Sequence, residues 1–277
     1  MTLRTMARSI RRYFRRKKEL EKIIAFQIQC LPDYYMPGIG PGEFVKVGEE
    51  LVELFRREAG LRKNDAVLDL GCGLARVAIP LQRVLTRGSY EGFDVVPDII
   101  HWNTVNISGP SPNFRFTLVD AGSSSYNPSG EAPAGSVVFP YPDGHFTFAF
   151  ATSLFSHLMA DATSRYLSET ARVLKPGGRA FLTFFLLDDF ARERARQGTT
   201  YPTFAHAWEH GLLNNPDKPE DAVAYDVDWV LDAIRQAGLQ PRLPVRWGAW
   251  SGRPQPLSYQ DVIIVEKKQR RATRPSP

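Results

Sequence analysis

The sequence of 277 residues has only two cysteines and no hydrophobic run long enough to cross a lipid bilayer. Cys30 and Cys72 cannot form a disulfide framework, and they lie too far apart in the chain to resemble a zinc-binding pair. The longest apolar run, at residues 180–187, is far shorter than the roughly 20 residues that a transmembrane helix needs. Residues 1–9 lack the apolar core of a signal peptide. These absences predict a cytoplasmic protein without a transmembrane segment.

The composition is 43% hydrophobic, 12% aromatic and 23% charged, which excludes collagen-like, low-complexity and fully disordered chains. Positive charge is concentrated at the two ends of the sequence. Residues 1–22 carry a net charge of +7 and residues 266–277 carry +4, whereas residues 23–265 carry −6. A basic end can attract phosphate backbones or anionic lipid, and it can also be a solvated helix face or a frayed tail. Contact of residues 1–22 with an anionic membrane surface is therefore a hypothesis, and the acidic body disfavours nucleic acid as a partner.

The hydrophobic periodicity divides the chain into a helical beginning and an alternating body. Helices are predicted at residues 8–29 and 45–59, separated by a bend rich in glycine and proline. Strands then alternate with helices, which predicts a parallel sheet. The predicted strands are residues 66–70, 90–94, 114–119, 146–151 and 179–185, and the predicted helices between them are residues 74–85, 97–105 and 162–174. A polar insertion at about 188–225 interrupts this rhythm, and we expect a lid there, before a helix at 227–237 and two late strands near Val245 and Val262.

The segment at residues 67–76 reads as a buried strand that ends in a glycine-rich turn and opens a helix. In an open α/β sheet this turn lies at the carboxyl ends of the strands, where the crevice binds nucleotides. The dinucleotide fingerprint needs a glycine where this chain has Arg76, and a phosphate-binding Walker A loop needs a Gly-Lys-Ser/Thr ending, which is absent. The segment therefore indicates a nucleotide-like ligand other than those two.

This turn resembles the first motif of the class I S-adenosylmethionine-dependent methyltransferases, an acid followed by glycines at every second position. Asp69, Gly71 and Gly73 match the motif, and Ala75 replaces its last glycine. Further matches follow in the family's order, and they extend the resemblance to residues 38–266, with the bacterial type 11/12 methyltransferases as the most similar group. They are Asp94, Asp120, the two segments 139–146 and 151–158 around the fourth strand, and the Lys175-Pro176-Gly177-Gly178 turn before the fifth.

The resemblance implies an α/β fold with a Rossmann-like, doubly wound sheet of seven mostly parallel strands and an antiparallel last strand. Residues 45–266 would form the methyltransferase domain, with the lid-like insertion at about 188–225. Residues 1–44 would form a basic helical extension that covers the cofactor, and residues 267–277 a basic tail. Tyr34, Tyr35 and Phe44 would either present aromatic faces near the sulfonium or simply pack.

The resemblance also implies S-adenosyl-L-methionine as the cofactor and S-adenosyl-L-homocysteine as its product. Asp94 would accept hydrogen bonds from the ribose hydroxyls. Asp120 would accept one from the adenine amino group, beside Ala121. The full set of predicted cofactor-binding residues is Asp69, Gly71, Cys72, Gly73, Asp94, Val95, Asp120, Ala121 and Ser153.

Methyl transfer from a sulfonium needs alignment above all, but an oxygen nucleophile must also lose a proton. His157 follows the fourth strand, so it is the candidate general base, with a structural or cofactor-contacting role as the alternative. His206, Glu209 and His210 formally match an inverted zinc-protease pattern. No third ligand is indicated, so we predict no metal there and assign this group to the acceptor site or to packing of the lid.

The chain lacks the Asn/Asp-Pro-Pro-aromatic run that amino-group methylases of nucleic-acid bases carry after the fourth strand, and has residues 151–154 as Ala-Thr-Ser-Leu instead. We therefore predict O-methylation of a small molecule, either a sugar hydroxyl or a natural-product phenol. Two alternatives stay open: an RNA or protein methyltransferase recruited by the basic termini, and a non-catalytic module that binds S-adenosylmethionine. The acceptor and the oligomeric state are not determined by the sequence.

Overall fold

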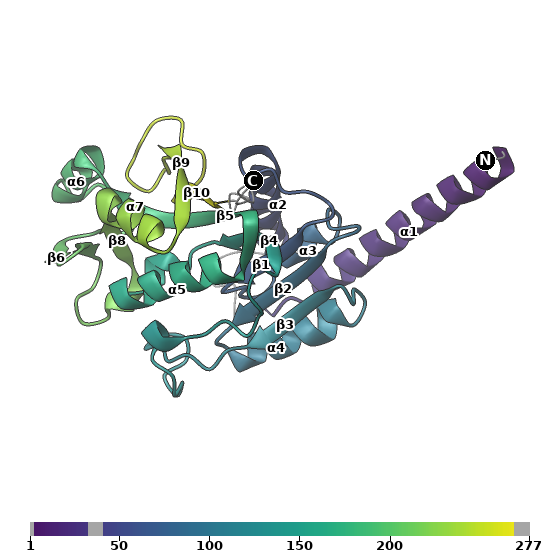
Figure 1. The fold of residues 1–277 in the computed structure, drawn as a ribbon, viewed down its shortest axis with the longest axis horizontal. Helices are drawn as coiled ribbons and strands as arrows, with labels where there is room; N and C mark the ends of the chain where they lie inside the picture. Colours follow the sequence, from purple (N-terminus) through teal and green to yellow (C-terminus); the bar gives the residue numbers. More distant parts are fainter. Residues whose placement is uncertain (1–2, 33–40, 269–277) are drawn as a thin grey trace, which may run out of the picture.

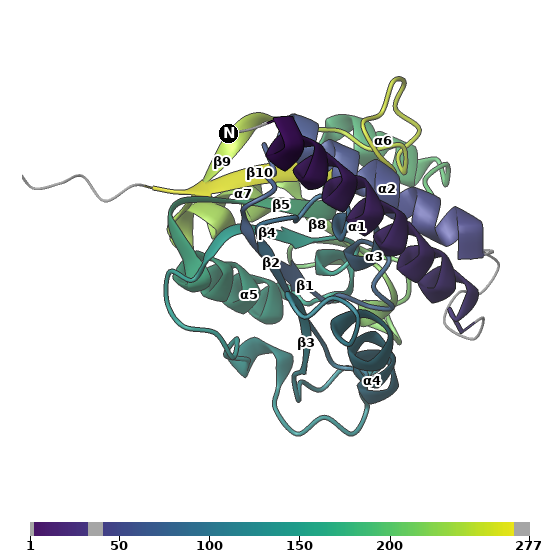
Figure 2. The ribbon, with the colours of Figure 1, turned by 90° about the vertical axis from the view of Figure 1, so that its right-hand side faces the viewer.

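A mixed sheet with helices on both faces forms the body of the protein, as a computed structural model of residues 3–32 and 41–268 shows (Figures 1 and 2). Seven of its strands have the order β3-β2-β1-β4-β5-β10-β9. The first five run parallel, whereas β10 is antiparallel to both β5 and β9. The predicted seven-stranded sheet with an antiparallel last strand is confirmed. Its strands are β1 (Ala66–Leu70), β2 (Ser89–Asp94), β3 (Phe114–Leu118), β4 (Phe146–Ala151), β5 (Leu174–Leu187), β9 (Leu239–Arg246) and β10 (Asp261–Lys267).

Hydrophobic cores lie on both faces of this sheet because the central strands are apolar on both sides. In β4, Phe148 and Phe150 point to one face, where Phe55 packs with ring centroids 5.8 and 4.7 Å away. Ala149 and Ala151 point to the other face. Figure 2 shows α5 on one side of the sheet and α1, α2 and α3 on the other. The helices are α1 (Leu3–Gln29), α2 (Pro41–Glu58), α3 (Ala78–Leu81), α4 (Pro97–Asn103), α5 (Ala160–Val173), α6 (Asp189–Arg196) and α7 (Val227–Gln236), with shorter helical turns at η2 (Thr104–Ser108), η3 (Ala134–Ser136), η4 (Phe155–His157) and η5 (Pro219–Asp221).

The insertion after β5 contains three strands that the periodicity did not predict. They are β6 (His206–Trp208), β7 (Gly211–Leu213) and β8 (Val223–Asp226). β8 pairs in parallel with the end of β5, and β7 and β6 follow in antiparallel order. β5 therefore pairs with β10 along its middle and with β8 along its last residues. Strands of three or four residues are too short to show an alternation, which is why the sequence read as a polar loop.

The predicted helix at residues 74–85 is wrong in extent, since only α3 is α-helical. Ala75 has a left-handed φ of 57°, which interrupts the helix before it starts. Pro80 lacks the N–H that would bond to the Arg76 carbonyl. Gly48 of α2 lies against that carbonyl so closely that a Cβ there would come within 1.9 Å of the oxygen. The irregular turn thus lets α2 cross directly over the glycine-rich loop.

The C-terminal part of α1 is fixed to the body, and its N-terminal part projects away from it (Figure 1). The buried Gln27 accepts a hydrogen bond of 2.8 Å from Gln82, and the Trp102 indole donates one of 3.1 Å to the Cys30 carbonyl. None of the helices in residues 3–32 and 41–268 is long and apolar enough to cross a membrane. Tyr34, Tyr35 and most of the predicted basic tail lie outside the described residues.

Candidate functional site

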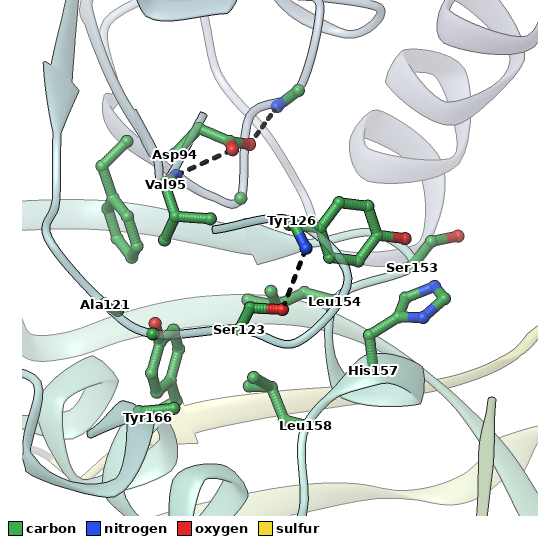
Figure 3. A pocket seen from close by; sticks show the side chains of 15 residues that line it. Asp94, Val95, Ala121, Ser123, Tyr126, Ser153, Leu154, His157, Leu158 and Tyr166 are labelled. Carbon is green, nitrogen blue, oxygen red and sulfur yellow. Dashed lines mark hydrogen bonds between the residues drawn. The ribbon is translucent and has the colours of Figure 1, made fainter. Parts of the chain in front are cut away.

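A cleft lies at the carboxyl ends of β1, β2, β3 and β4, where the sequence placed the nucleotide-like ligand (Figure 3). We call it the main cleft. Beside it, around the glycine-rich loop, lies a second depression that we call the loop hollow. The main cleft is lined by Gly71, Gly73, Phe93, Asp94, Val95, Ala121, Gly122, Ser123, Tyr126, Ala134, Ser153, Leu154, His157, Leu158 and Tyr166. The loop hollow is lined by Phe44, Asp69, Gly71, Cys72, Gly73, Leu74, Arg76, Val77, Val96, Asp98, Ile99, Ser125, Tyr126 and Thr152.

Asp94, at the end of β2, ties the second strand to the glycine-rich loop (Figure 3). One carboxylate oxygen accepts a hydrogen bond of 2.8 Å from the Gly73 N–H. The other accepts bonds of 2.8 and 3.2 Å from the N–H groups of Val95 and Val96. Burial raises the pKa of Asp94, and the three backbone N–H groups oppose that shift. A carboxylate has about four lone-pair sites, so acceptor capacity is left for a ligand hydroxyl.

Asp69 is almost completely buried at the floor of the loop hollow. The Tyr90 hydroxyl donates a hydrogen bond of 2.6 Å to its Oδ2. Its Oδ1 has no hydrogen-bond partner among the described residues. Burial raises the pKa of Asp69 to about 8, against the lowering effect of the Tyr90 hydrogen bond. An orphaned acceptor of this kind fits a ligand that carries a positive charge.

Arg76 lines the loop hollow with no hydrogen bond or ion pair to another side chain in the described part of the chain. Burial lowers the pKa of its guanidinium, and the Asp69 carboxylate raises it. The guanidinium carbon lies 5.7 Å from the centre of the Phe44 ring. Phe44 therefore lines the loop hollow and contacts a protein cation there. An unpaired cation and an orphaned carboxylate oxygen side by side suit a zwitterionic ligand.

The predicted residues Cys72, Val95, Ala121 and Ser153 all line the main cleft or the loop hollow. The Cys72 thiol is buried, with its pKa raised by burial, and it is packed rather than reactive. Ser153 adopts a left-handed φ of 58°. Its N–H donates to the Thr183 hydroxyl at 2.9 Å, and its own hydroxyl donates to a Gln260 oxygen at 3.1 Å. These bonds hold the turn after β4 in its strained conformation.

Asp120, the predicted adenine contact, does not line the main cleft. It is exposed beside β3 and accepts a hydrogen bond of 3.2 Å from the Glu131 N–H. The neighbours Val119 and Ala121 are buried, so the alternation of the extended chain turns Asp120 to the opposite side. At this strand end the main cleft is lined by Ala121 and not by the Asp120 carboxylate.

His157 lies in η4 and lines the main cleft, on the same side as Ser153 and Tyr126 (Figure 3). Its Nδ1 is 2.9 Å from the carbonyl oxygen of Glu220. A carbonyl only accepts hydrogen bonds, so Nδ1 carries the proton in the neutral ring. The Nε2 atom then has a free lone pair, which is the state that a general base needs.

Several residues of the main cleft were not predicted from the sequence, above all those between β3 and β4. Ser123 and Tyr126 come from this segment, and Tyr126 reaches both the main cleft and the loop hollow. Tyr166 from α5 lines the opposite side, where burial raises the pKa of its phenol to about 12. The interval between these strands is much longer than the usual loop of about 2–6 residues, and that length was a usable signal of function.

His206 and His210 do not lie on one helical face, because β6 and β7 form a hairpin there. The His210 ring stacks on Trp229, with centroids 4.8 Å apart, and neither histidine lines the main cleft or the loop hollow. The zinc-protease pattern is thus a coincidence of spacing. Within residues 3–32 and 41–268, no group of three metal-ligating side chains is placed to hold an ion.

Comparison with known families identifies the family of the chain. Residues 43–218 match the family model described as a methyltransferase domain, which spans more than half of the chain. The chain belongs to this family, and it is an S-adenosylmethionine-dependent methyltransferase. The orphaned oxygen of Asp69 and the unpaired guanidinium of Arg76 fit the amino-acid part of that cofactor, and the acceptor capacity of Asp94 fits its ribose.

Solved structures show the same fold at low sequence identity. The PH0226 protein from Pyrococcus horikoshii is 16% identical with a TM-score of 0.57, over 86% of this chain and 99% of that one. A putative sarcosine dimethylglycine methyltransferase from Galdieria sulphuraria is 15% identical with a TM-score of 0.51, over 81% and 86%. The 1,6-didemethyltoxoflavin-N1-methyltransferase from Burkholderia thailandensis, solved with S-adenosylhomocysteine, is 16% identical with a TM-score of 0.50, over 82% and 79%. At these identities the likeness defines the fold and not the acceptor.

Proposed function

We propose that the enzyme methylates a hydroxyl group of a small molecule, such as a sugar or a natural-product phenol. The observation that carries this proposal is His157, a histidine of the main cleft whose Nε2 is free to accept a proton. O-methylation needs such an acceptor, because the hydroxyl must lose its proton as the new bond forms. The sulfonium of the cofactor supplies the activated methyl group. The chain then contributes alignment and exclusion of water, worth about 7–11 kcal/mol in favourable cases.

The acceptor has a suitable place where a third depression, the outer hollow between α2 and the chain that precedes β10, meets the main cleft that His157 lines. Arg76 and Thr152 line both the outer hollow and the loop hollow, and Ser153 lines the outer hollow and the main cleft. The three depressions therefore meet at the turn after β4. The other residues of the outer hollow combine polar and apolar side chains: Val47, Glu50, Leu51, Glu53, Leu54, Arg57, Thr183, Leu257, Ser258, Tyr259 and Gln260. A polyhydroxylated acceptor would find donors and acceptors on these walls.

In this proposal, a particular residue binds each part of the cofactor. Asp94 takes the ribose hydroxyls, Asp69 the ammonium and Arg76 the carboxylate. Ala121 and its neighbours surround the adenine. His157 accepts the proton of the acceptor hydroxyl at Nε2.

The proposal is tested by supplying methyl-labelled S-adenosylmethionine with a panel of sugars, phenols, amines, RNA and peptides. Label in a methyl ether, with turnover lost in His157→Gln while S-adenosylhomocysteine still binds, is the expected result. Label only in amines, RNA or protein, or full turnover by the variant, contradicts it. A folded enzyme that binds the cofactor but methylates nothing in the panel favours the non-catalytic module.

The projecting part of α1 supports a contact with an anionic membrane surface. Residues 15–18 are Arg-Arg-Lys-Lys, and all four side chains are exposed. Their attraction to anionic lipid is worth about 1 kcal/mol per basic residue near the surface. Sedimentation with phosphatidylserine vesicles should retain the full chain and not a variant that begins at residue 19. RNA binding in place of vesicle binding would favour the nucleic-acid alternative. The two free cysteines are compatible with the cytoplasmic location that we propose.

A further inference from the structure

Glu220 connects two segments that are far apart in the sequence and meet at the edge of the main cleft. It lies in η5, within the insertion after β5. Its Oε2 accepts three hydrogen bonds from the segment after β3: from the Ser123 hydroxyl at 2.9 Å, the Ser124 N–H at 2.8 Å and the Ser124 hydroxyl at 2.9 Å. A weaker bond of 3.3 Å joins Ser125 to Asp221 beside it. One carboxylate oxygen thus holds the insertion and the segment together.

The same residue also contacts the proposed general base. The Glu220 carbonyl accepts the hydrogen bond from Nδ1 of His157 at 2.9 Å. Without that acceptor, the ring could carry its proton on Nε2 and would no longer accept one there. The backbone and the side chain of Glu220 therefore contact two different segments that line the main cleft.

The segment that Glu220 holds is itself compact. The N–H and carbonyl groups of Ser123 and Asn127 exchange two hydrogen bonds of 3.1 Å, and the Asn127 amide donates to the Ala121 carbonyl at 3.1 Å. This closed turn presents Tyr126 over the cleft, in edge contact with His157 at 5.6 Å between ring centroids (Figure 3). Hydrogen bonds within the turn set its shape, so its position on the protein depends on its contacts with other segments. Glu220 supplies three of these hydrogen bonds.

We propose that Glu220 is a positioning residue of the active site, which rests on the proposed role of His157 and the cofactor cleft. Its carboxylate holds Tyr126 over the bound cofactor, and its carbonyl fixes the proton of His157 on Nδ1. Glu220 thereby couples retention of the cofactor to the protonation state that lets His157 act as a base. None of the family motifs in the sequence includes Glu220, since both segments lie between the strands that carry those motifs.

The test compares Glu220→Ala with Glu220→Gln and with the neighbouring Asp221→Asn as a matched control. Dissociation of S-adenosylhomocysteine is followed by stopped flow, and the protonation of His157 by ¹⁵N nuclear magnetic resonance. We expect dissociation about ten-fold faster in Glu220→Ala, since charge-assisted hydrogen bonds of this kind are lost. Glu220→Gln keeps an acceptor oxygen and should recover part of the effect, whereas Asp221→Asn should behave as the parent protein.

Glu220→Ala should also give mixed Nδ1 and Nε2 protonation of His157, because a displaced η5 no longer presents its carbonyl. The double variant Ser123→Ala, Ser124→Ala keeps Glu220 and removes two of the three donors, so it should speed dissociation without depending on the fold of η5. Unchanged dissociation and unchanged His157 resonances in both Glu220→Ala and the double variant overturn the proposal. Failure of the proposed function is separate: His157→Gln would then keep full turnover, whatever the Glu220 variants do to dissociation.

Discussion

The Tyr90 hydroxyl donates a hydrogen bond of 2.6 Å to one oxygen of Asp69, while the other oxygen has no partner in the described part of the chain. Burial raises the pKa of Asp69 to about 8, so in the ligand-free enzyme this carboxyl is mostly protonated at pH 7. A cationic ligand favours the ionised form and lowers that pKa. Protonation of Asp69 and cofactor binding are therefore linked.

Cofactor affinity should thus rise as the pH is raised from about 6 to 8, because fewer protons have to be displaced. Calorimetric titration with S-adenosylmethionine at pH 7, in buffers with different ionisation enthalpies, should detect release of a proton. Asp69→Asn should bind more weakly and without this proton release. Equal proton release by that variant would assign the linkage to another group.

Asp94 and Asp120 form a matched pair, since Asp94 ends β2 and Asp120 lies just after the end of β3. Asp94→Asn should weaken S-adenosylhomocysteine binding by about 100-fold, because hydrogen bonds to a charged group are worth about 1.5–3 kcal/mol each. Asp120→Asn should change it less than about two-fold, because this side chain lies outside the main cleft. Calorimetry of both variants checks the assignment, and a large loss in Asp120→Asn would restore the adenine role that the resemblance implied.

Asp261 holds three donors in the buried start of β10: the N–H groups of Leu186 at 2.8 Å and Gly248 at 2.7 Å, and the Trp250 indole at 2.5 Å. Asp261→Ala should lower the free energy of unfolding by about 3–5 kcal/mol, because all three donors lose their partner. Glu266→Gln on the same strand breaks a partly exposed pair with Arg242 and should cost less than about 1 kcal/mol. Urea unfolding of both variants gives the comparison, and similar losses would contradict it.

Phe55 ties α2 to the sheet, with its ring centroid 4.7 Å from Phe150 and 4.8 Å from Phe181. Phe55→Ala should reduce the unfolding free energy by about 3–5 kcal/mol, through lost burial and the cavity that is left. Val47→Ala on the same helix, at 37% exposure, should cost less than about 1 kcal/mol. A small effect of Phe55→Ala in thermal or urea unfolding would mean that α2 is attached more loosely than its packing indicates.

Where the local sequence determines where a strand begins and ends, its bounds were predicted correctly. β1 and β4 have the predicted bounds because their apolar runs end at a glycine-rich turn and at a polar turn. The helix over residues 74–85 was wrong because Ala75 takes a glycine-like conformation and Pro80 removes a hydrogen bond. Asp69, Asp94 and the glycine-rich loop, which the motif predicts to lie together, line the main cleft and the loop hollow, since neighbouring strands hold the loop and both carboxylates.

The residues that reach the cleft from insertions could not be predicted in the same way. The contact of Ser124 with Glu220 joins positions 96 residues apart, and no local pattern marks either one. The orientation of Asp120 depends on how the chain turns after β3, which is set by bonds to the distant Glu131 segment. Such features follow from the packing of two loops against each other, which periodicity does not encode.

Because the end of β5 also pairs with β8, backbone hydrogen bonds attach the insertion directly to the sheet. The short strands β6, β7 and β8 can unfold locally while the central strands stay folded. Unfolding of β5 would disrupt the insertion and the central sheet together. The protein should therefore unfold in steps, and the insertion that carries Glu220 should exchange its amide hydrogens first. A ligand would then reach the cleft when the insertion unfolds locally, while the central strands stay folded.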